Sequence, residues 1–149
     1  MDIEKLMAIL EKMLIVDEGC ELKPYKDSVG KLTIGIGRNL DDVGIRLSEA
    51  KVMLQNDAMD SLAKCMSFIP FFRELDQARQ CVLLDMAFNL GIQGLLKFKK
   101  MLQAVKDGDY QLAALEMFDS RWHIQVGKRA DRLEEMMRTG EIHKDYKGV

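Results

Sequence analysis

A single stretch of β-type sequence, residues 23–37, interrupts a chain that otherwise shows the periodicity of helices. Residues 23–26 and 31–34 have strand patterns, and Asp27-Ser28-Val29-Gly30 between them is a turn sequence with Asp first and Gly last. Only two prolines occur in 149 residues, and Leu, Met, Ala, Glu and Lys are abundant. The sequence therefore predicts an α+β fold that is mostly helical and contains one short β-hairpin.

Apolar residues at helical spacing predict helices on both sides of the hairpin. The first covers Asp2 to Val16 and ends in Asp17-Glu18, with Gly19 as a left-handed cap. Ser48 and Asp76 are predicted to cap the next two helices, and the second is apolar nearly all round, as a buried helix is. The predicted helices after the hairpin cover residues 48–66, 76–90 (ended by Gly91), 93–105, 109–118 and 128–137. Gly108-Asp109 and Gly140 are predicted to supply breaks and caps for the last of these helices.

The length suits one domain, which we expect to span residues 1–149. Within it the pattern predicts a small lobe that holds the hairpin, approximately residues 17–60, and a larger helical lobe of residues 1–16 and 61–149. The helix from Ser48 would join the two lobes. A cleft between lobes is the natural place for a ligand.

Two carboxylates and a hydroxyl are gathered around the hairpin, at Glu18, Asp27 and Thr33. Hydrolysis of a glycosidic bond needs such groups, because one acid protonates the leaving oxygen and a second group activates water on the opposite face of the sugar. Each residue also has a simpler interpretation. Glu18 could be a solvated helix end, Asp27 a turn residue that bonds its own backbone, and Thr33 an ordinary strand residue.

Two features favour a functional interpretation of the same stretch. Asp17 and Glu18 lie at the negative end of a helix dipole, which is locally unfavourable. Gly35 and Gly37 alternate in the TIGIG run, so one face of the predicted strand lacks side chains. Glycines so placed suggest the close approach of a ligand or another backbone.

These residues resemble those of the phage-type lysozymes, a muramidase family that contains many bacteriophage endolysins. The resemblance rests on the pattern E-G-(x7)-D-(x5)-T at Glu18, Gly19, Asp27 and Thr33, and on TIGIG at Thr33 to Gly37. It covers most of the chain in order and continues at Leu47-Ser48-Glu49-Ala50, residues 76–90, Ser120-Arg121-Trp122, Arg129-Ala130 and Arg138-Thr139-Gly140.

The resemblance implies a lysozyme-like fold and hydrolysis of the β-1,4 bond between N-acetylmuramic acid and N-acetylglucosamine in peptidoglycan. It makes Glu18 the acid, while Asp27 and Thr33 handle the attacking water, which would invert the anomeric centre. Arg129 matches the arginine that pairs with the catalytic glutamate and would lower its pKa, against the effects of burial and the helix dipole. Asn89 and Gln125 would face the cleft and hydrogen-bond acetamido groups.

The chain departs from the common family pattern in two places. Arg38 follows TIGIG where many relatives carry His, and we expect it to pair with an acidic residue of the next helix, with Asp57 as the best candidate. Only residues 39–47 separate this point from that helix, whereas the best-known relatives insert further structure. This predicts a smaller lobe and a more open cleft.

Hydropathy and charge limit which partners and which cellular location we expect for the protein. No apolar run approaches the ~20 residues of a membrane span, so no stable membrane insertion is expected. Charged residues throughout residues 2–12 make a poor signal peptide and favour synthesis in the host cytoplasm. The net charge of −2 gives no argument for nucleic acid. By resemblance the protein would be a monomeric bacteriolytic endolysin that acts on glycan strands of the wall, after a separate membrane-permeabilising phage protein gives access.

The reactive side chains predict neither a cofactor nor a metal. Three cysteines make an odd count, typical of free thiols in a reducing compartment. Cys20 lies beside Glu18, but no His nearby in sequence would activate it as a nucleophile. His123 and His143 are the only histidines, which gives little support for a zinc site. Trp122, the only Trp, is interpreted as a core anchor, with sugar stacking as the alternative.

Three other functions remain open from the sequence. The chain could be a peptidoglycan-binding or regulatory module without turnover, although Glu18, Asp27 and Thr33 are all present. It could be a helical interaction protein, which would leave the glycines and the acidic helix end without an explanation. A lytic transglycosylase is the nearest enzymatic rival. That class needs an acid but no pair that activates water, so Asp27 discriminates against it.

Overall fold

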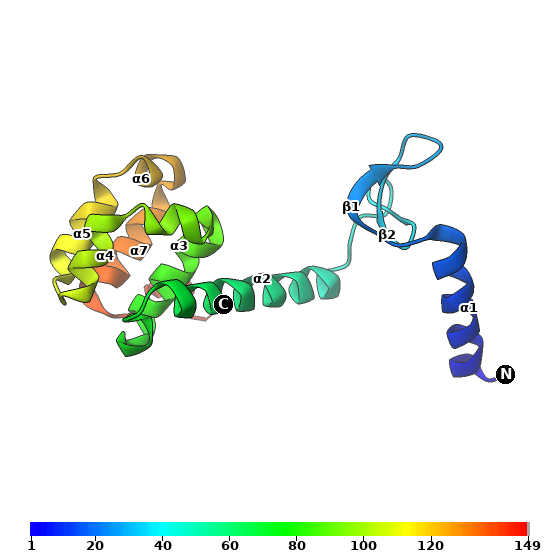
Figure 1. Cartoon of the computed structure of the whole chain (residues 1–149), viewed down its shortest axis with the longest axis horizontal. Helices are drawn as coiled ribbons and strands as arrows, with labels where there is room; N and C mark the ends of the chain where they lie inside the picture. Colours follow the sequence, from blue (N-terminus) through cyan, green and yellow to red (C-terminus); the bar gives the residue numbers. More distant parts are fainter. Residues whose placement is uncertain (149) are drawn as a thin grey trace. The chain divides into compact units, whose positions relative to one another are not determined.

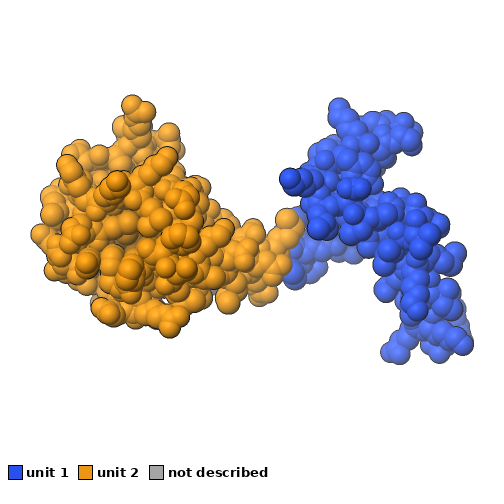
Figure 2. Space-filling model, in the orientation of Figure 1, with its two compact units in different colours: residues 1–52 blue, residues 53–149 orange. Residues whose placement is uncertain are grey.

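The computed structural model describes residues 1–148 and separates the chain into two compact units. Unit 1 is Met1–Val52, and unit 2 begins at Met53 (Figure 2). The elements run in the order α1 (Ile3–Glu18), β1 (Glu21–Lys26), β2 (Leu32–Gly35), β3 (Arg38–Asn39), α2 (Leu47–Phe68), the 3-10 turn η1 (Phe72–Glu74), α3 (Gln77–Leu96), α4 (Lys99–Lys106), α5 (Tyr110–Phe118), α6 (Arg121–Val126), α7 (Lys128–Thr139) and the 3-10 turn η2 (Lys144–Tyr146) (Figure 1). The predicted α+β, mostly helical fold class is confirmed.

Helix α1 begins and ends close to the predicted residues. The Asp2 side chain accepts a hydrogen bond from the Lys5 N–H at 3.1 Å, which caps the first turn, and Glu18 is the last helical residue. Gly19 has φ 71° and ψ −169°, so it is not the left-handed cap predicted; the chain turns directly from the helix into extended backbone. Unit 1 itself buries no side chain of α1. The expected place of residues 1–16 in the helical lobe stays a prediction.

The three strands form an antiparallel sheet in the order β1-β2-β3. Tyr25 pairs with Thr33, and the register shifts between Glu21 and Tyr25, where Pro24 has no N–H to donate to the ladder. The predicted turn is confirmed, because the Gly30 N–H donates to the Asp27 carbonyl at 3.0 Å. The TIGIG run is not one strand as predicted, since β2 ends at Gly35 and the chain reverses into β3.

Helix α2 starts in unit 1 and continues in unit 2. Ser48 is not its cap, because the helix already begins at Leu47. The Glu49 carboxylate instead reaches back and accepts the Arg46 N–H at 2.7 Å. This is the glutamate half of a capping box, in which a residue three positions into the helix satisfies the first free backbone donor.

Helix α3 is capped as predicted by Asp76, whose side chain accepts the Arg79 N–H at 3.0 Å. Gly91 breaks the helical backbone with φ 73° and ψ 161°, but the chain resumes helical turns to Leu96. The single helix predicted over residues 93–105 is wrong, because the chain leaves the helix near Phe98 before α4 begins. The Phe98 ring packs edge-on against Trp122 with 6.1 Å between ring centroids, a tertiary contact that overrides local helix preference.

The remaining helices follow the expected caps, with one addition. Asp109 caps α5, and Gly140 ends α7 in the left-handed conformation. Helix α6 is not predicted by apolar periodicity, because it is only six residues long. Ser120 caps it by accepting the His123 N–H at 3.2 Å.

The apolar core of the described chain lies in unit 2 and is built by α3, α4, α5, α6 and α7 with the end of α2. Trp122 is 3% exposed within it, which confirms its interpretation as a core anchor. Long unbranched methionines fill much of the core, as expected of an adaptable side chain. Its largest fully buried side chains are Leu83, Met86, Leu95, Met101, Met117, Leu133 and Met137.

Among residues 1–148, no single helix is long and apolar enough to cross a membrane. Helices α3 and α4 pass a length and composition test only when taken together, and they are bent by 102° at the break between them.

Candidate active site

Asp27 occupies the corner of the hairpin and is held by the backbone of its own turn. One carboxylate oxygen, Oδ1, accepts the Val29 N–H at 3.0 Å and the Lys31 N–H at 2.8 Å. The Asp27 N–H donates in turn to the Lys31 carbonyl at 2.9 Å. The simple interpretation, an aspartate that bonds its own turn, is therefore correct for Oδ1. No hydrogen bond to the second oxygen, Oδ2, occurs in the described residues, which leaves it free for water.

Thr33 lies beside this turn on β2 and is 3% exposed, the only buried residue of unit 1. Its hydroxyl donates to the Lys31 carbonyl at 3.0 Å. The hydrogen is therefore committed, and the lone pairs of the oxygen remain available to accept a hydrogen bond. The Asp27 and Thr33 side chains thus both hydrogen-bond to the backbone of Lys31, and these bonds fix the two side chains relative to each other.

Glu18 reaches this sheet from the end of α1. A methyl group added at Gly37 would lie 2.7 Å from Oε2 of Glu18 and 2.9 Å from its carboxyl carbon. No side chain fits between them, so the Glu18 carboxyl group packs directly on the Gly37 backbone. The close approach predicted from the two glycines occurs at Gly37, where the approaching group is this carboxyl, but a methyl group at Gly35 would meet nothing within 4 Å. Unit 1 therefore brings Glu18 to the same small sheet that carries Asp27 and Thr33.

A bidentate ion pair supports the turn after TIGIG. Both terminal nitrogens of Arg38 donate to the Glu49 carboxylate at 2.8 Å, and Nη1 also donates to the Gly44 carbonyl at 3.2 Å. The Arg38 hydrogen bonds, followed by the Arg46 N–H, hold the pKa of Glu49 at about 2. The expectation that Arg38 pairs with the next helix is confirmed. The choice of Asp57 is wrong, because Glu49 lies in the first turn of α2, directly opposite Arg38.

Two carboxylates pin the loop that follows the sheet. Asp41 accepts the Leu32 N–H at 2.8 Å, and Asp42 pairs with the Lys31 ammonium at 3.1 Å. These bonds hold the loop against the strand on which Thr33 lies. The geometry of the hairpin therefore depends on backbone N–H groups that donate to carboxylates, both in its own turn and in the loop that follows the sheet.

The residues expected to bind substrate or support Glu18 lie in unit 2. Arg129 on α7 donates from Nε to Asp85 of α3 at 2.7 Å. The Asn89 side-chain oxygen accepts the Trp122 indole N–H at 2.9 Å, which leaves its NH₂ group free to donate. Gln125 on α6 is exposed. The pairing of Arg129 with Glu18, and the facing of Asn89 and Gln125 towards sugar, stay predictions.

The three cysteines are free thiols, as predicted. Burial raises the pKa of Cys65 to about 11. Burial and then the nearby Asp85 carboxylate raise the pKa of Cys81. Both thiols are therefore protonated at neutral pH and poor nucleophiles. Cys20 is exposed, and within residues 1–148 it forms no hydrogen bond with a base.

Sequence reasoning missed several arrangements that depend on tertiary contacts. The Asn89–Trp122 hydrogen bond and the Arg129–Asp85 pair join α3 to helices more than 30 residues away along the chain. A third is the convergence of His123 with two carboxylates of α7. The only sequence signal for it was the spacing of Asp131 and Glu134, which places both on one face of a helix.

Comparison with known proteins decides the family. The family model described as phage lysozyme matches residues 16–139, which include every candidate site residue. The chain belongs to the phage lysozyme family. The enzyme is 30% identical over 171 residues to a protein named probable T4-type lysozyme 2 of Dictyostelium discoideum, with 95% of the chain and 100% of the relative covered. Probable T4-type lysozyme 1 of the same organism is 27% identical, with 93% and 98% covered.

A third relative is a larger protein. The enzyme is 30% identical over 161 residues to the pre-baseplate central spike protein Gp5 of Enterobacteria phage T4, with 89% of the chain but only 28% of that protein covered. Family membership makes this chain a glycoside hydrolase of the lysozyme type, whose chemistry is the muramidase-type hydrolysis of peptidoglycan. The relatives differ in context, since they include proteins of an amoeba and of a phage particle.

Proposed function

We propose that this lysozyme is an endolysin that hydrolyses the muramic acid to glucosamine β-1,4 bond with inversion, and that Glu18, Asp27 and Thr33 perform the chemistry. The observation that carries the proposal is that Asp27 and Thr33 both hydrogen-bond the Lys31 backbone, while the Glu18 carboxyl group packs on Gly37 in the turn between β2 and β3. Glu18, the proposed acid, is thereby held at a different place from Asp27 and Thr33, the pair that would hold the water.

The proposed reaction divides the work between these groups. Glu18 donates a proton to the glycosidic oxygen, and the leaving sugar departs as an alcohol. Water is held by the free Oδ2 of Asp27 and by a lone pair of the Thr33 oxygen, and it loses its proton to the Asp27 carboxylate as it attacks. Thr33 cannot form the covalent intermediate that a carboxylate forms in a retaining enzyme, so attack from the opposite face inverts the anomeric carbon.

The resemblance adds three residues of unit 2 to the proposal. Arg129 has donors besides those on Asp85, because a guanidinium carries five N–H groups, and one of them would hold Glu18 in place. The free NH₂ group of Asn89 and the amide of Gln125 would bind acetamido groups of the glycan. Because Trp122 fixes the Asn89 oxygen, only one orientation of that amide is available to the sugar.

The proposed biological setting rests on the likeness to endolysins. A peptidoglycan hydrolase made in the host cytoplasm is kept from its substrate by the inner membrane. We therefore propose that it is a monomer that lyses the host once a separate phage protein permeabilises that membrane. The test is induction in a Gram-negative host. Turbidity should fall only after the inner membrane is permeabilised, and lysis without permeabilisation would contradict this setting.

The reaction itself is tested on purified peptidoglycan. NMR of the fresh product should show the α anomer of the new reducing end first, followed by slow conversion to the equilibrium mixture. A first product in the β form would establish retention and exclude the proposed water. A 1,6-anhydro end would identify a lytic transglycosylase, in which no water is consumed.

A further inference from the structure

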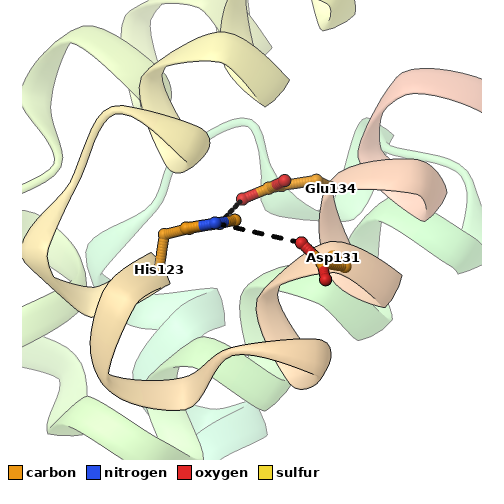
Figure 3. A group of neighbouring side chains, drawn as sticks. All are labelled: His123, Asp131 and Glu134. Atoms are coloured by element: carbon orange, nitrogen blue, oxygen red, sulfur yellow. Dashed lines mark hydrogen bonds and ion pairs between the residues drawn. The ribbon is translucent and has the colours of Figure 1, made fainter.

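His123 belongs to α6, and carboxylates of α7 lie near both of its ring nitrogens (Figure 3). Its Nδ1 is 2.6 Å from Oε1 of Glu134, and its Nε2 is 3.9 Å from Oδ1 of Asp131. The first distance is that of a strong hydrogen bond, and the second is too long for one. Because a carboxylate can only accept, Nδ1 donates to Glu134, and a ring that carries this one proton presents the Nε2 lone pair towards Asp131.

His143, the other histidine, is a natural comparison because carboxylates also lie near both of its nitrogens. Its Nδ1 already accepts the Asp145 backbone N–H at 3.1 Å, so its proton is on Nε2, 3.2 Å from Glu135. Both nitrogens of His143 are therefore occupied. His123 differs in having an oriented nitrogen lone pair with no hydrogen-bond donor facing it among the described residues.

We propose that His123 and Asp131 bind a divalent transition-metal ion of the Zn²⁺ type, with Glu134 as the carboxylate that orients the histidine. Metal-binding histidines commonly donate their other N–H to a carboxylate, which fixes the tautomer and makes the metal-facing nitrogen more basic. Glu134 stands in that relation to His123. The ligand atoms of the three residues lie within 4.8 Å of one another.

The separation of the two proposed ligands suits one ion. Two ligands with bonds of about 2.1 Å in a tetrahedral arrangement lie roughly 3.4 Å apart. The observed 3.9 Å closes to this value by a small movement of Asp131, whose side chain is 65% exposed and free to turn. Water would fill the remaining positions. The 2.6 Å between Nδ1 and Glu134 leaves no room for an ion there, so Glu134 is not a direct ligand in this geometry.

The surroundings hold the histidine and favour positive charge. The His123 side chain is 19% exposed, and the Phe118 ring packs on it with 4.7 Å between centroids. Within residues 1–148, no Lys or Arg forms an ion pair with Asp131 or Glu134. A cation at Nε2 would balance the negative charge of these two carboxylates.

A bound ion would join α6 to α7 across Gly127, which has φ 54° and ψ −117° and separates the two helices. Gln125 lies two residues after His123, and Arg129 lies two residues before Asp131. The ion would therefore stiffen the segment that presents the two unit 2 side chains expected at the substrate. The binding claim does not depend on the proposed roles of those side chains.

Zinc binding to the full chain at pH 7.5 tests the proposal by calorimetry and by NMR of the histidine side chains. His123→Ala and Asp131→Asn should each weaken zinc affinity at least about tenfold, since each removes a direct ligand. Glu134→Gln should weaken it about 10- to 100-fold, as removal of an orienting carboxylate does. His143→Ala is the matched control and should leave affinity within about twofold of wild type.

All four variants keep the three cysteines, so zinc held by thiols contributes equally to each. Asp131→Asn guards against a folding defect, because that side chain is largely exposed. In the wild type, zinc should shift the Nε2 signal of His123 and leave both His143 signals in place. Equal affinity in wild type and His123→Ala, or unmoved His123 signals at 1 mM zinc, would show that His123 and Glu134 form a hydrogen-bonded pair and nothing more.

Discussion

The two units of this lysozyme are ordered by different physical means. Unit 2 has a continuous apolar core, in which side chains such as Leu83 and Met137 are fully buried. In unit 1 only Thr33 is buried. Its hairpin and the loop that follows are held instead by backbone N–H groups that donate hydrogen bonds to the carboxylates of Asp27, Asp41 and Glu49.

This difference between the units assigns most of the stability to unit 2 and the proposed catalytic groups to unit 1. A packed core contributes free energy in proportion to the apolar area it removes from water, and unit 2 holds nearly all of that area in the described chain. Hydrogen bonds to backbone contribute about 1 kcal/mol each, but they fix atoms in direction as well as in position. The proposed catalytic groups lie in unit 1, where hydrogen bonds fix the orientation of side chains. Substitutions in the two units should therefore change different measured quantities.

The largest effect is expected in unit 1 from Asp27→Asn. Asparagine keeps an oxygen that can accept the Val29 and Lys31 N–H groups, so the turn should persist. It cannot take a proton from water, and lysis should fall about 10²–10⁴-fold with no loss of melting temperature. The measurement is the initial rate on permeabilised cells beside a thermal melt. A variant that melts early would mean that Asp27 acts mainly as a turn residue.

The next effect is expected in unit 2 from Leu83→Ala. Leu83 has no exposed surface, and its truncation leaves a cavity in the core. The free energy of unfolding should fall by about 2–5 kcal/mol, while the initial lytic rate below the melting transition stays near wild type. Leu115→Ala is the control, because Leu115 is 62% exposed on α5 and should change stability by under about 0.5 kcal/mol. Equal losses in the two variants would show that burial in the core has no special role in stability.

A smaller effect is expected from crowding of the Glu18 carboxyl group. Gly37→Ala places a methyl group 2.7 Å from Glu18 Oε2, whereas the same change at Gly35 meets nothing within 4 Å. The two glycines have nearly equal φ values of 69° and 67°, so backbone strain is matched. Displacement of a reacting group by about 1 Å can cost up to ~10²-fold in rate. Gly37→Ala should therefore lose kcat beyond Gly35→Ala at equal stability; equal kcat in both would show that Gly37 does not position Glu18.

The smallest effect concerns Arg38 and Glu49. The pKa of Glu49 is lowered from 4.5 to about 2, so the stability from this pair is present above pH 4.5 and is lost as pH falls towards 2. The contribution of this pair to the wild-type melting temperature should therefore stay constant from pH 5 to 8. In Arg38→His the pair should weaken as pH rises and the histidine loses its charge. Melts of both proteins, with Glu49→Gln in a double-mutant cycle, measure the coupling; parallel curves would refute the pair.

Local patterns predicted much of this molecule. The hairpin turn at Asp27, the caps at Asp76 and Asp109, and the left-handed end at Gly140 all depend on residues within a few positions of one another. Contacts between such near neighbours can be predicted from the spacing of residues in the sequence. The burial of Trp122 followed from its size and apolar surface.

The errors arose where distant residues meet. The break at Phe98 depends on the Trp122 ring, 24 positions away, and the partner of Arg38 depends on how tightly the chain returns into α2. The same limit applies to the site. Spacing identified Glu18, Asp27 and Thr33 as candidates, but it could not show that the Glu18 carboxyl group packs on Gly37 or that Lys31 links the other two.

The most direct test of this account is Glu18→Gln, measured in two assays on the same preparation. Glutamine keeps the volume that packs on Gly37 but cannot donate the proton, so lysis of permeabilised cells should fall at least ~10²-fold while the melting temperature stays at the wild-type value. Glu21→Gln is the control, because Glu21 is an exposed glutamate three residues away on β1 and should change neither quantity. Lysis by Glu18→Gln within a few-fold of wild type, with an unchanged melt, would contradict the assignment of the acid.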